Sequence, residues 1–392
     1  MKLLWSTDGH WFPETYLLAV NQMREGLYRV LSEYVQRGAL TVEQSVTIVH
    51  DLLFDTANNI YELELELTPS EVEAAPEIPL PHPAKGLLSN FEQFLDVNDS
   101  VKFLRLQWLD YTATLRVRIL PVKQAVTMFR ESRFIGITKA VLGLLQMDLI
   151  VEGFAATGEY NLVPDFEGLR LSARAGHATV FCEFQEKDGS EVDICPRTTL
   201  RQQVKKCSDA GQAFLVGFEI EVVFMRPSVE DLDVTFGKTP LTLQGGHAWS
   251  AAQALQSSEI MDVVESIVSK LESVGIELLQ FHPETAPGQY EFVLGPQPPV
   301  AAVDTLLSAR EIIRQVAADA GLRATLYPKP FPQTCGNGAH IHLSLQPDTN
   351  WRNFYAGVLA HLRDMSALLY ANEASYERAV DGAWAGSSWI TW

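Results

Sequence analysis

The sequence is poor in cysteine and in cationic residues, and both shortages exclude classes of protein. Only four of its 392 residues are cysteines, and no two of them form a CxxC pair. So few cysteines cannot build a disulfide framework, and we expect a reducing, cytoplasmic setting. Lys and Arg number 30 against 49 Asp and Glu, which gives a formal charge of −19. Nucleic acid and anionic lipid both attract basic surfaces, so we expect neither nucleic acid nor a membrane as a partner.

Long hydrophobic runs are also missing. No apolar run approaches the ~20 residues that are needed to span a bilayer. The first eight residues, MKLLWSTD, reach an acid too early for a signal peptide. The apolar content of 47% is nevertheless close to the globular average of about 45–50%. At ~150 residues per domain, the length predicts roughly two to three folded domains.

Apolar residues at helical spacing predict two helices near the start of the chain. The first covers about 15–37, and the second begins after Thr41, which forms a capping-box pattern with Gln44, and ends near Asn58. Residues 69–83 hold five prolines among acids, a density that prevents helix or sheet and predicts an extended linker. The predicted division is an N-terminal piece, a linker, a small sheet domain and a larger domain, with bounds 1–67, 68–86, 87–195 and 196–392.

Short apolar or alternating runs after the linker predict a small sheet. Residues 101–106 and 114–120 are typical of strands. Residues 179–184 and 192–194 indicate a hairpin, because Lys187-Asp188-Gly189 between them is a turn signal. From Pro196 onward, strands alternate with longer helices, so the predicted fold class is α+β. The two clearest helical patterns of that region cover 260–274 and 303–320.

Residues 217–224 read GFEIEVVF and alternate strictly between apolar and other positions. Because successive side chains of a strand point to opposite faces, Glu219 and Glu221 should share one face, opposite the apolar side chains. Two carboxylates at this spacing repel one another unless water or a cation separates them. Taken alone, such a strand is more often the solvated face of a sheet than a binding site.

Two later segments repeat this arrangement. Residues 282–292 read HPETAPGQYEF, in which His282 and Glu284 precede a Pro-Gly turn and Gln289 and Glu291 share a face of the next strand. Residues 336–344 read GNGAHIHLS, with His340 and His342 on one face and apolar residues on the other. A hairpin with a polar outer face, or core histidines bonded to backbone, would also explain each segment by itself.

The three segments together favour a shared site. A sheet that assembles them would carry acids and one imidazole on a single concave surface. Oxygen-rich ligation with one imidazole suits Mg²⁺ or Mn²⁺. Such ions neutralise phosphate oxygens, which would let a chain of charge −19 bind ATP. The expected members of this surface are Glu219, Glu221, Glu284, Glu291 and His340.

In order and in spacing, these segments resemble the three main signatures of the glutamine synthetase family, and the resemblance covers about 87–392. It implies a small β-grasp domain followed by a catalytic domain with a curved antiparallel sheet. Trp5-Ser6-Thr7-Asp8 and the two helices after it resemble the end of an amidohydrolase barrel. The whole order is similar to the fungal FluG-type fusion, in which an amidohydrolase-like barrel precedes a glutamine synthetase-like half. Shorter matches support the family resemblance, at Trp108-Leu109-Asp110, Val163-Pro164-Asp165, Pro196-Arg197 and Ser375-Tyr376-Glu377-Arg378.

The resemblance also implies a reaction. ATP would phosphorylate the side-chain carboxylate of glutamate, and ammonia or an amine would attack the acyl phosphate. Glu221, Glu284 and Glu291 would hold one metal ion. Glu219 and His340 would hold a second ion, which bridges the phosphates of ATP.

The remaining site residues follow from the same resemblance. His342 and Ser344 would lie along the nucleotide, Gly336 would offer backbone to glutamate, and Arg378 would pair with the substrate carboxylate. Asp110 would reach the site of a neighbouring subunit and help bind ammonium, because family members form rings with shared active sites.

Departures from the family pattern leave two functions open. Trp384 occupies the place of an acid that closes over the ammonium site, which points to a larger or more apolar amine. The chain stops at Trp392, so we expect the catalytic domain to be incomplete, without the later arginines and the last ligand of the second metal. The alternative is a catalytically degenerate binding or regulatory protein. An amidohydrolase using His340 and His342 is disfavoured, because its elements would occur in reverse order.

Overall fold

The computed structural model describes residues 13–66, 87–154, 157–227, 238–240, 247–252, 258–332, 334–347 and 351–378. The chain divides into two compact units, Met1–Glu77 and Ile78–Trp392. Several predictions concern residues outside the described ranges, namely those on Trp5 to Asp8, the linker at 68–86 and Trp384. The domain bounds given above stay predictions.

The first unit contains the two predicted N-terminal helices. α1 is Pro13–Gln36, and α2, Val42–His50, continues through a π-helical turn at Asp51–Asp55 into α3, Thr56–Ile60. The capping box is confirmed, since the Thr41 backbone N–H donates to Gln44 Oε1 at 2.8 Å and the Gln44 N–H donates to Thr41 Oγ1 at 3.1 Å. The similarity of this unit to an amidohydrolase barrel stays a prediction.

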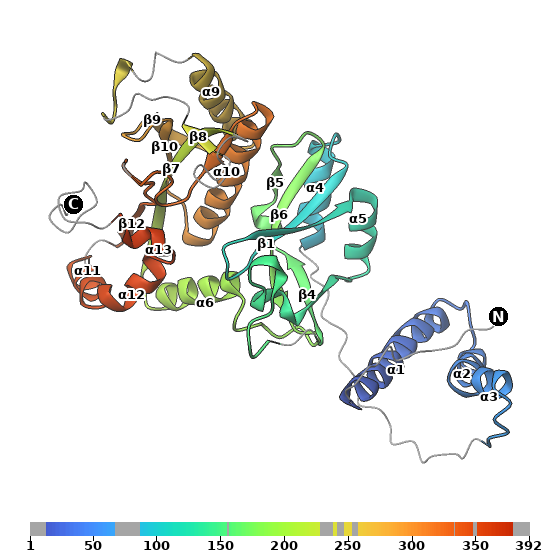
Figure 1. Cartoon of the computed structure of the whole chain (residues 1–392). Coiled ribbons are helices and arrows are strands. Elements are labelled where there is room, and N and C mark those ends of the chain that lie inside the picture. Colours follow the sequence, from blue (N-terminus) through green and yellow to red (C-terminus); the bar gives the residue numbers. More distant parts are fainter. Residues whose placement is uncertain are drawn as a thin grey trace. The chain divides into compact units, whose positions relative to one another are not determined.

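The second unit begins with a mixed six-stranded sheet and two helices (Figure 1). The strand order is β2-β1-β6-β4-β3, and β5 also pairs with β6. β1 and β6 run parallel, and the other neighbours run antiparallel. The elements are α4 (Leu87–Val97), β1 (Phe103–Leu109), β2 (Leu115–Pro121), α5 (Val122–Arg130), β3 (Ile135–Thr138), β4 (Glu159–Pro164), β5 (Arg170–Leu171), β6 (His177–Gln185) and 3₁₀ turns at Lys139–Gly143, Gln146–Asp148 and Phe166–Gly168.

The predicted hairpin at 179–194 is wrong in its second strand. The turn exists, because the Glu186 backbone N–H donates to Ser190 at 2.9 Å, but only one bridge, between Gln185 and Glu191, follows it. β6 pairs instead with β1 and β4, which are distant in sequence. These pairings with distant strands satisfy much of the β6 backbone without a second hairpin strand.

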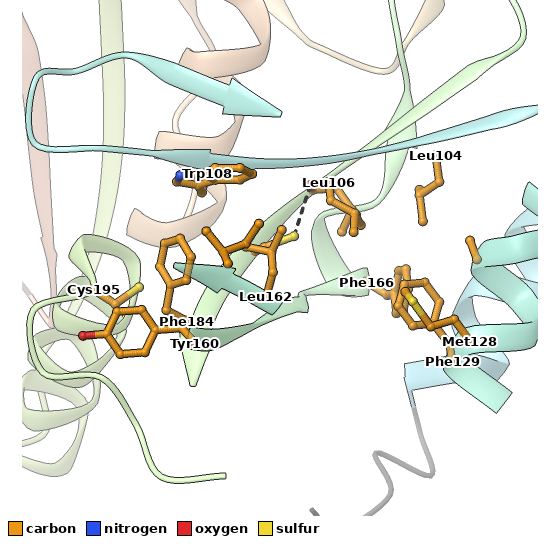
Figure 2. Close-up of a cluster of buried hydrophobic side chains, with 14 of the residues drawn as sticks. Leu104, Leu106, Trp108, Met128, Phe129, Tyr160, Leu162, Phe166, Phe184 and Cys195 are labelled. Carbon is orange, nitrogen blue, oxygen red and sulfur yellow. Dashed lines mark hydrogen bonds between the residues drawn. The ribbon is translucent and has the colours of Figure 1, made fainter. Parts of the chain in front are cut away.

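A hydrophobic core lies between this sheet and its helices. Figure 2 shows Leu104, Leu106 and Trp108 of β1 together with Phe184 of β6 and Phe166, all of them buried. The Trp108 and Phe184 rings meet edge to face at 5.9 Å. Whether this sheet domain is a β-grasp domain stays a prediction.

The rest of the second unit is an antiparallel sheet with helices. The strand order is β11-β7-β10-β9, and β12 and β8 also pair with β7. The elements are α6 (Pro196–Asp209), β7 (Ala213–Pro227), β8 (Lys238–Pro240), α9 (Ser258–Ser273), β9 (Leu278–Pro283), β10 (Gln289–Leu294), α10 (Pro299–Asp319), β11 (Arg323–Thr325), β12 (Ile341–Gln346), α11 (Trp351–Ala360), α12 (Leu362–Leu369) and α13 (Glu373–Tyr376).

α9 and α10 cover the apolar face of this second sheet (Figure 1). Ile220 and Val222 of β7 and Phe292 of β10 pack in one cluster with Ile267 of α9 and Ile313 of α10. The predicted alternation is therefore confirmed at Glu219–Val222 of β7 and at Phe292 of β10. Further along the opposite face of β7, Val223 and Met225 form a small separate apolar cluster with Ala286.

β12 departs from its predicted packing. Its apolar residues Ile341 and Leu343 were expected to oppose the histidines within a core, but they are 51% and 37% exposed among the described residues. Pairing with β7, in the register Ile341 to Phe218 through Gln346 to Ala213, holds the strand. None of the described helices is long and apolar enough to cross a membrane.

Buried charges join the two sheets of the second unit. Arg197 of α6 donates to Asp304 of α10 and to Asp165 Oδ2, the latter at 2.5 Å. Asp304 is only 2% exposed, and burial raises its pKa to about 6 although Arg197 opposes this shift. Arg105 of β1 pairs with Glu311 of α10. These contacts hold the first sheet against α10, the helix that packs on the second sheet.

Candidate metal and substrate site

Two adjacent strands supply the acidic centre of the site. Glu221 of β7 lies directly opposite Glu291 of β10, and Glu219 lies opposite Val293. Glu221 and Glu291 are buried at 9% and 7% exposure. The strand alternation explains this placement, because the other faces of β7 and β10 pack against helices.

β12 brings two imidazoles to the same carboxylate. His340 Nδ1 lies 2.8 Å from Glu219 Oε2, and His342 Nε2 lies 2.9 Å from Glu219 Oε1. The structure therefore places His342 beside the acidic centre as well as on the exposed strand. Ser344 follows on β12, opposite Leu215 of β7. The predicted contact of His342 and Ser344 with a nucleotide stays a prediction.

A second group of possible ligands shares Glu291. His282, at the end of β9, faces Glu291 in the strand register, and its Nε2 lies 3.4 Å from Glu291 Oε1. Its Nδ1 lies 3.4 Å from Glu284 Oε1. Within each of two groups, Glu219–Glu291–His340 and His282–Glu284–Glu291, one ligand atom per residue lies within 4.8 Å of the others.

The carboxylates of the site destabilise one another's charged forms. Burial, followed by the charges of Glu219, Glu221 and Glu284, raises the pKa of Glu291 to about 8. Burial and the charge of Glu221 also raise the pKa of Glu284. Without a cation, the cluster thus retains a proton at neutral pH. A divalent ion would replace that proton and neutralise the repulsion.

Gln289 connects the acidic centre to the loop at 336–338. Its Nε2 lies 2.8 Å from Glu221 Oε2, 3.0 Å from the Gly336 carbonyl oxygen and 3.1 Å from Asn337 Oδ1. Its Oε1 accepts a hydrogen bond from the Ala286 N–H at 2.9 Å. The side chain fixes the loop that carries Gly336 relative to the carboxylates.

Two glycines of this loop lie too close to neighbouring atoms for a Cβ to be added without a shift. A Cβ on Gly338 would overlap Glu221 Oε1 and would lie 2.8 Å from His340 Nε2. A Cβ on Gly336 would overlap the Pro328 carbonyl and would lie 2.9 Å from Arg378 Cδ. Gly336 and Arg378, both predicted to bind glutamate, therefore lie in contact.

Asp110 does not join this cluster. It follows β1 in the other sheet, where its carboxylate accepts hydrogen bonds from the backbone of Thr112 and Thr114, each at 2.9 Å, and from Arg116 Nε at 2.7 Å. Burial raises the pKa of Asp110, but hydrogen bonds from Arg116 and Thr112 outweigh it and lower the value overall. Its predicted role in the site of a neighbouring subunit stays a prediction.

Two residues beside the acidic centre were not assigned to the predicted site, although the sequence analysis noted His282 before the turn. His282 stands two positions before Glu284, so strand alternation was a usable signal that both share a face. Trp249 gave no signal, because it lies in a loop far from any motif. Its indole donates a hydrogen bond to Glu284 and meets the His282 ring edge to face at 6.2 Å.

The donor set fits a divalent cation. It combines buried carboxylates that repel one another, imidazole nitrogens, and a buried His282 Nδ1 that has no hydrogen-bond partner among the described residues. No cysteine belongs to either group of possible ligands. Such a set suits Mg²⁺, Mn²⁺ or a neighbouring transition metal better than a thiolate zinc site.

The fold and the site together define a class of protein in which acids and imidazoles gather on one face of an antiparallel sheet and helices cover the other face. Comparison with known proteins makes the class specific. Residues 193–392 match the family model of the glutamine synthetase catalytic domain. The chain belongs to the glutamine synthetase family, as its three signature segments suggested.

Individual relatives support this assignment. The chain is 40% identical over 397 residues to "Protein fluG" of Emericella nidulans, an alignment that covers 100% of this chain and 45% of that protein. It is 28% identical to a glutamate–isopropylamine ligase of a Pseudomonas species, over 64% of this chain and 60% of the relative. A solved structure described as a novel glutamine synthase homolog superposes with a TM-score of 0.60 at 28% identity, and covers 71% of this chain and 67% of the other. The chain thus spans about half the length of the curated relatives it matches.

Proposed function

We propose that this protein is an ATP-dependent ligase that joins the side-chain carboxylate of glutamate to ammonia or an amine. The convergence of Glu219, Glu221, Glu284, Glu291 and His340 on one face of the second sheet carries this proposal. It rests also on the family, whose named members include a glutamate–isopropylamine ligase.

The proposed chemistry has two steps. A side-chain carboxylate oxygen of glutamate attacks the γ-phosphorus of ATP, the bond to the β-phosphate oxygen breaks, and ADP leaves. The amine nitrogen then attacks the acyl carbon, phosphate leaves with the electron pair of the carbon–oxygen bond, and the nitrogen loses a proton. Glu284 and Glu291, together with Glu219 and His340, would hold Mg²⁺ or Mn²⁺, which supplies Lewis acidity and neutralises phosphate charge.

The chain's own residues would bind and orient the substrates. Arg378 and the backbone at Gly336 lie in contact and would hold the glutamate carboxylate, for which a planar guanidinium is well suited. His342 and Ser344, on the exposed strand β12, would lie along ATP. Asp110 of a neighbouring copy would help bind the amine in a homo-oligomeric ring.

ADP release tests the proposal. The purified whole protein is incubated with ATP, glutamate and Mg²⁺ or Mn²⁺, and with ammonium, methylamine or isopropylamine in parallel. We expect glutamate-dependent ADP formation and an amide product with at least one amine. Glu291→Gln should abolish turnover, whereas Glu265→Gln, at an exposed position of α9, should leave it unchanged. Metal and nucleotide binding without turnover for any amine would favour the non-catalytic alternative and refute the ligase proposal.

A further inference from the structure

Trp249 lies beside the acidic centre, and three contacts hold it there. Its backbone N–H donates to the Pro283 carbonyl oxygen at 2.9 Å. Its indole donates a hydrogen bond to Glu284 and meets the His282 ring edge to face at 6.2 Å. The side chain therefore has a fixed place at the end of β9.

This tryptophan is nevertheless not covered by the chain. Trp249 is 66% exposed, and its φ of 61° is a left-handed conformation that costs free energy in a residue other than glycine. A covered tryptophan buries a large apolar area, and sites for small organic molecules are commonly lined by aromatic rings beside a few polar groups. The chain thus holds an uncovered aromatic ring in a fixed place beside a group of acids.

The acidic centre lies between Trp249 and the loop at 336–338, which is predicted to bind glutamate. Glu221 of β7 contacts that loop, since a Cβ on Gly338 would overlap its Oε1. β10 follows β7 in the sheet, and β9 follows β10. Adjacent strands are about 4.7–4.9 Å apart, so β9 lies about 10 Å from β7. A small molecule in contact with Trp249 is therefore within a few ångströms of the carboxylates and close to a glutamate held by the loop.

The acids favour a cation in this place. Alkylamines, like the lysine side chain, are mostly protonated at neutral pH, and both carboxylates and aromatic faces attract such cations. The carbon atoms of an alkylamine would also remove apolar surface of the indole from water. An ammonium ion has no carbon atoms and gains nothing from this second contact. The neighbouring carboxylates are those of Glu219, Glu221, Glu284 and Glu291.

We propose that Trp249 lines the binding site of the amine substrate, and that this substrate is a primary amine with an apolar substituent. The inference rests on the proposed ligase function and deepens it by naming the class of amine. The substituent packs on the Trp249 indole, while the nitrogen is directed toward Glu284 and the acyl carbon of the activated glutamate. Trp249 is then a residue that determines specificity, and the metal ligands keep their proposed roles.

A ratio of rate constants tests the inference, because effects common to all amines cancel in it. For the whole protein with ATP, glutamate and Mg²⁺ or Mn²⁺, kcat/KM is measured for isopropylamine and for ammonium. The unmodified chain should prefer isopropylamine. Trp249→Ala should lower the ratio of the two values by about 10-fold or more, because only the isopropyl group contacts the indole. Trp351→Ala, at a 49% exposed tryptophan of α11, is the matched control and should leave the ratio unchanged.

Trp249→Phe separates ring packing from the hydrogen bond to Glu284 and covers the case in which Trp249→Ala misfolds. It keeps an aromatic ring but lacks the indole N–H, so the ratio should stay within about 3-fold of that of the unmodified chain. Isopropylamine should also change the tryptophan fluorescence of the unmodified chain in the presence of glutamate and a non-hydrolysable ATP analogue. Trp249→Phe should remove this change.

Two results would overturn the inference and leave the ligase proposal standing. One is turnover with ammonium but with no organic amine. The other is an equal loss for both amines in Trp249→Ala, which would mean that Trp249 only supports Glu284. Absence of turnover with any amine would refute both proposals.

Discussion

The amide of Gln289 lies 2.8 Å from Glu221, and through this bond the acidic face of the sheet is joined to the loop that carries Gly336. The same amide also lies within hydrogen-bond distance of the Gly336 carbonyl and Asn337. Gln289 therefore holds both Glu221 and the loop that is predicted to bind glutamate.

Replacement of Gln289 by Leu should therefore affect stability and glutamate binding together. It would leave the buried Ala286 N–H and Glu221 without partners, and we expect a loss of about 1–3 kcal/mol in the free energy of unfolding. The KM for glutamate should rise as the loop loosens. Urea unfolding and substrate titration measure the two effects. Gln315→Leu, on the exposed face of α10, should change stability by less than about 0.5 kcal/mol; equal effects of both changes would contradict the assigned role.

Gly338→Ala should weaken metal binding. The new methyl group would overlap Glu221 Oε1 and crowd His340 Nε2, so both side chains must move. We expect at least about a 10-fold loss in Mn²⁺ affinity, measured by calorimetry. Gly357→Ala in α11 is the matched control, because a Cβ there meets no atom within 4 Å and helical Ala is favoured by about 0.5–1 kcal/mol. Unchanged affinity in Gly338→Ala would show that the loop is not close to the ions.

Arg197→Met should destabilise the junction between the two sheets of the second unit. It removes the partner of Asp304, which is then buried with an uncompensated charge, and such losses amount to about 3–5 kcal/mol. Arg197→Met combined with Asp304→Asn should recover part of that loss, because the uncompensated charge is gone. Calorimetric melting of Arg197→Met, Asp304→Asn and the double variant measures the coupling. Additive losses would mean that the two residues do not interact.

Asp110→Asn should reduce stability in a pH-dependent manner. The folded-state pKa of Asp110 lies below its usual value, so its contribution is fully present above about pH 3.8 and is lost as the pH falls through the folded-state pKa. We expect a cost of about 1.5–3 kcal/mol at pH 7, typical of hydrogen bonds to a charged group. In acid unfolding curves, the difference in free energy of unfolding between Asp110→Asn and the unmodified chain should shrink below about pH 3.8. A difference that stays constant with pH would contradict this assignment to the Asp110 charge.

Much of the site was predictable because strand alternation is a short-range property. Glu219 and Glu221 must share a face of β7 whatever the rest of the chain does. Glu291 must point to the face of β10 that Phe292 does not occupy. Register between strands is a different matter. The pairing of His282 with Glu291 depends on the length and conformation of the turn at 284–288, which no periodicity encodes.

Tertiary contacts decided the features that sequence reasoning missed. Residues 187–189 form a turn, yet the strand before it pairs with β1, more than seventy residues earlier in the chain. Trp249 reaches Glu284 from a loop whose sequence shows no motif. The expected core packing of Ile341 and Leu343 was inferred from alternation alone, and alternation does not tell which face other elements cover.

β7 pairs with four other strands while it carries Glu219 and Glu221 on one face and core side chains on the other. Opening this strand would break the ligand set and the apolar cluster in a single event. The amide hydrogens of Ile220 and Val222 should therefore be among the slowest to exchange with deuterated solvent, and metal loading should slow them further.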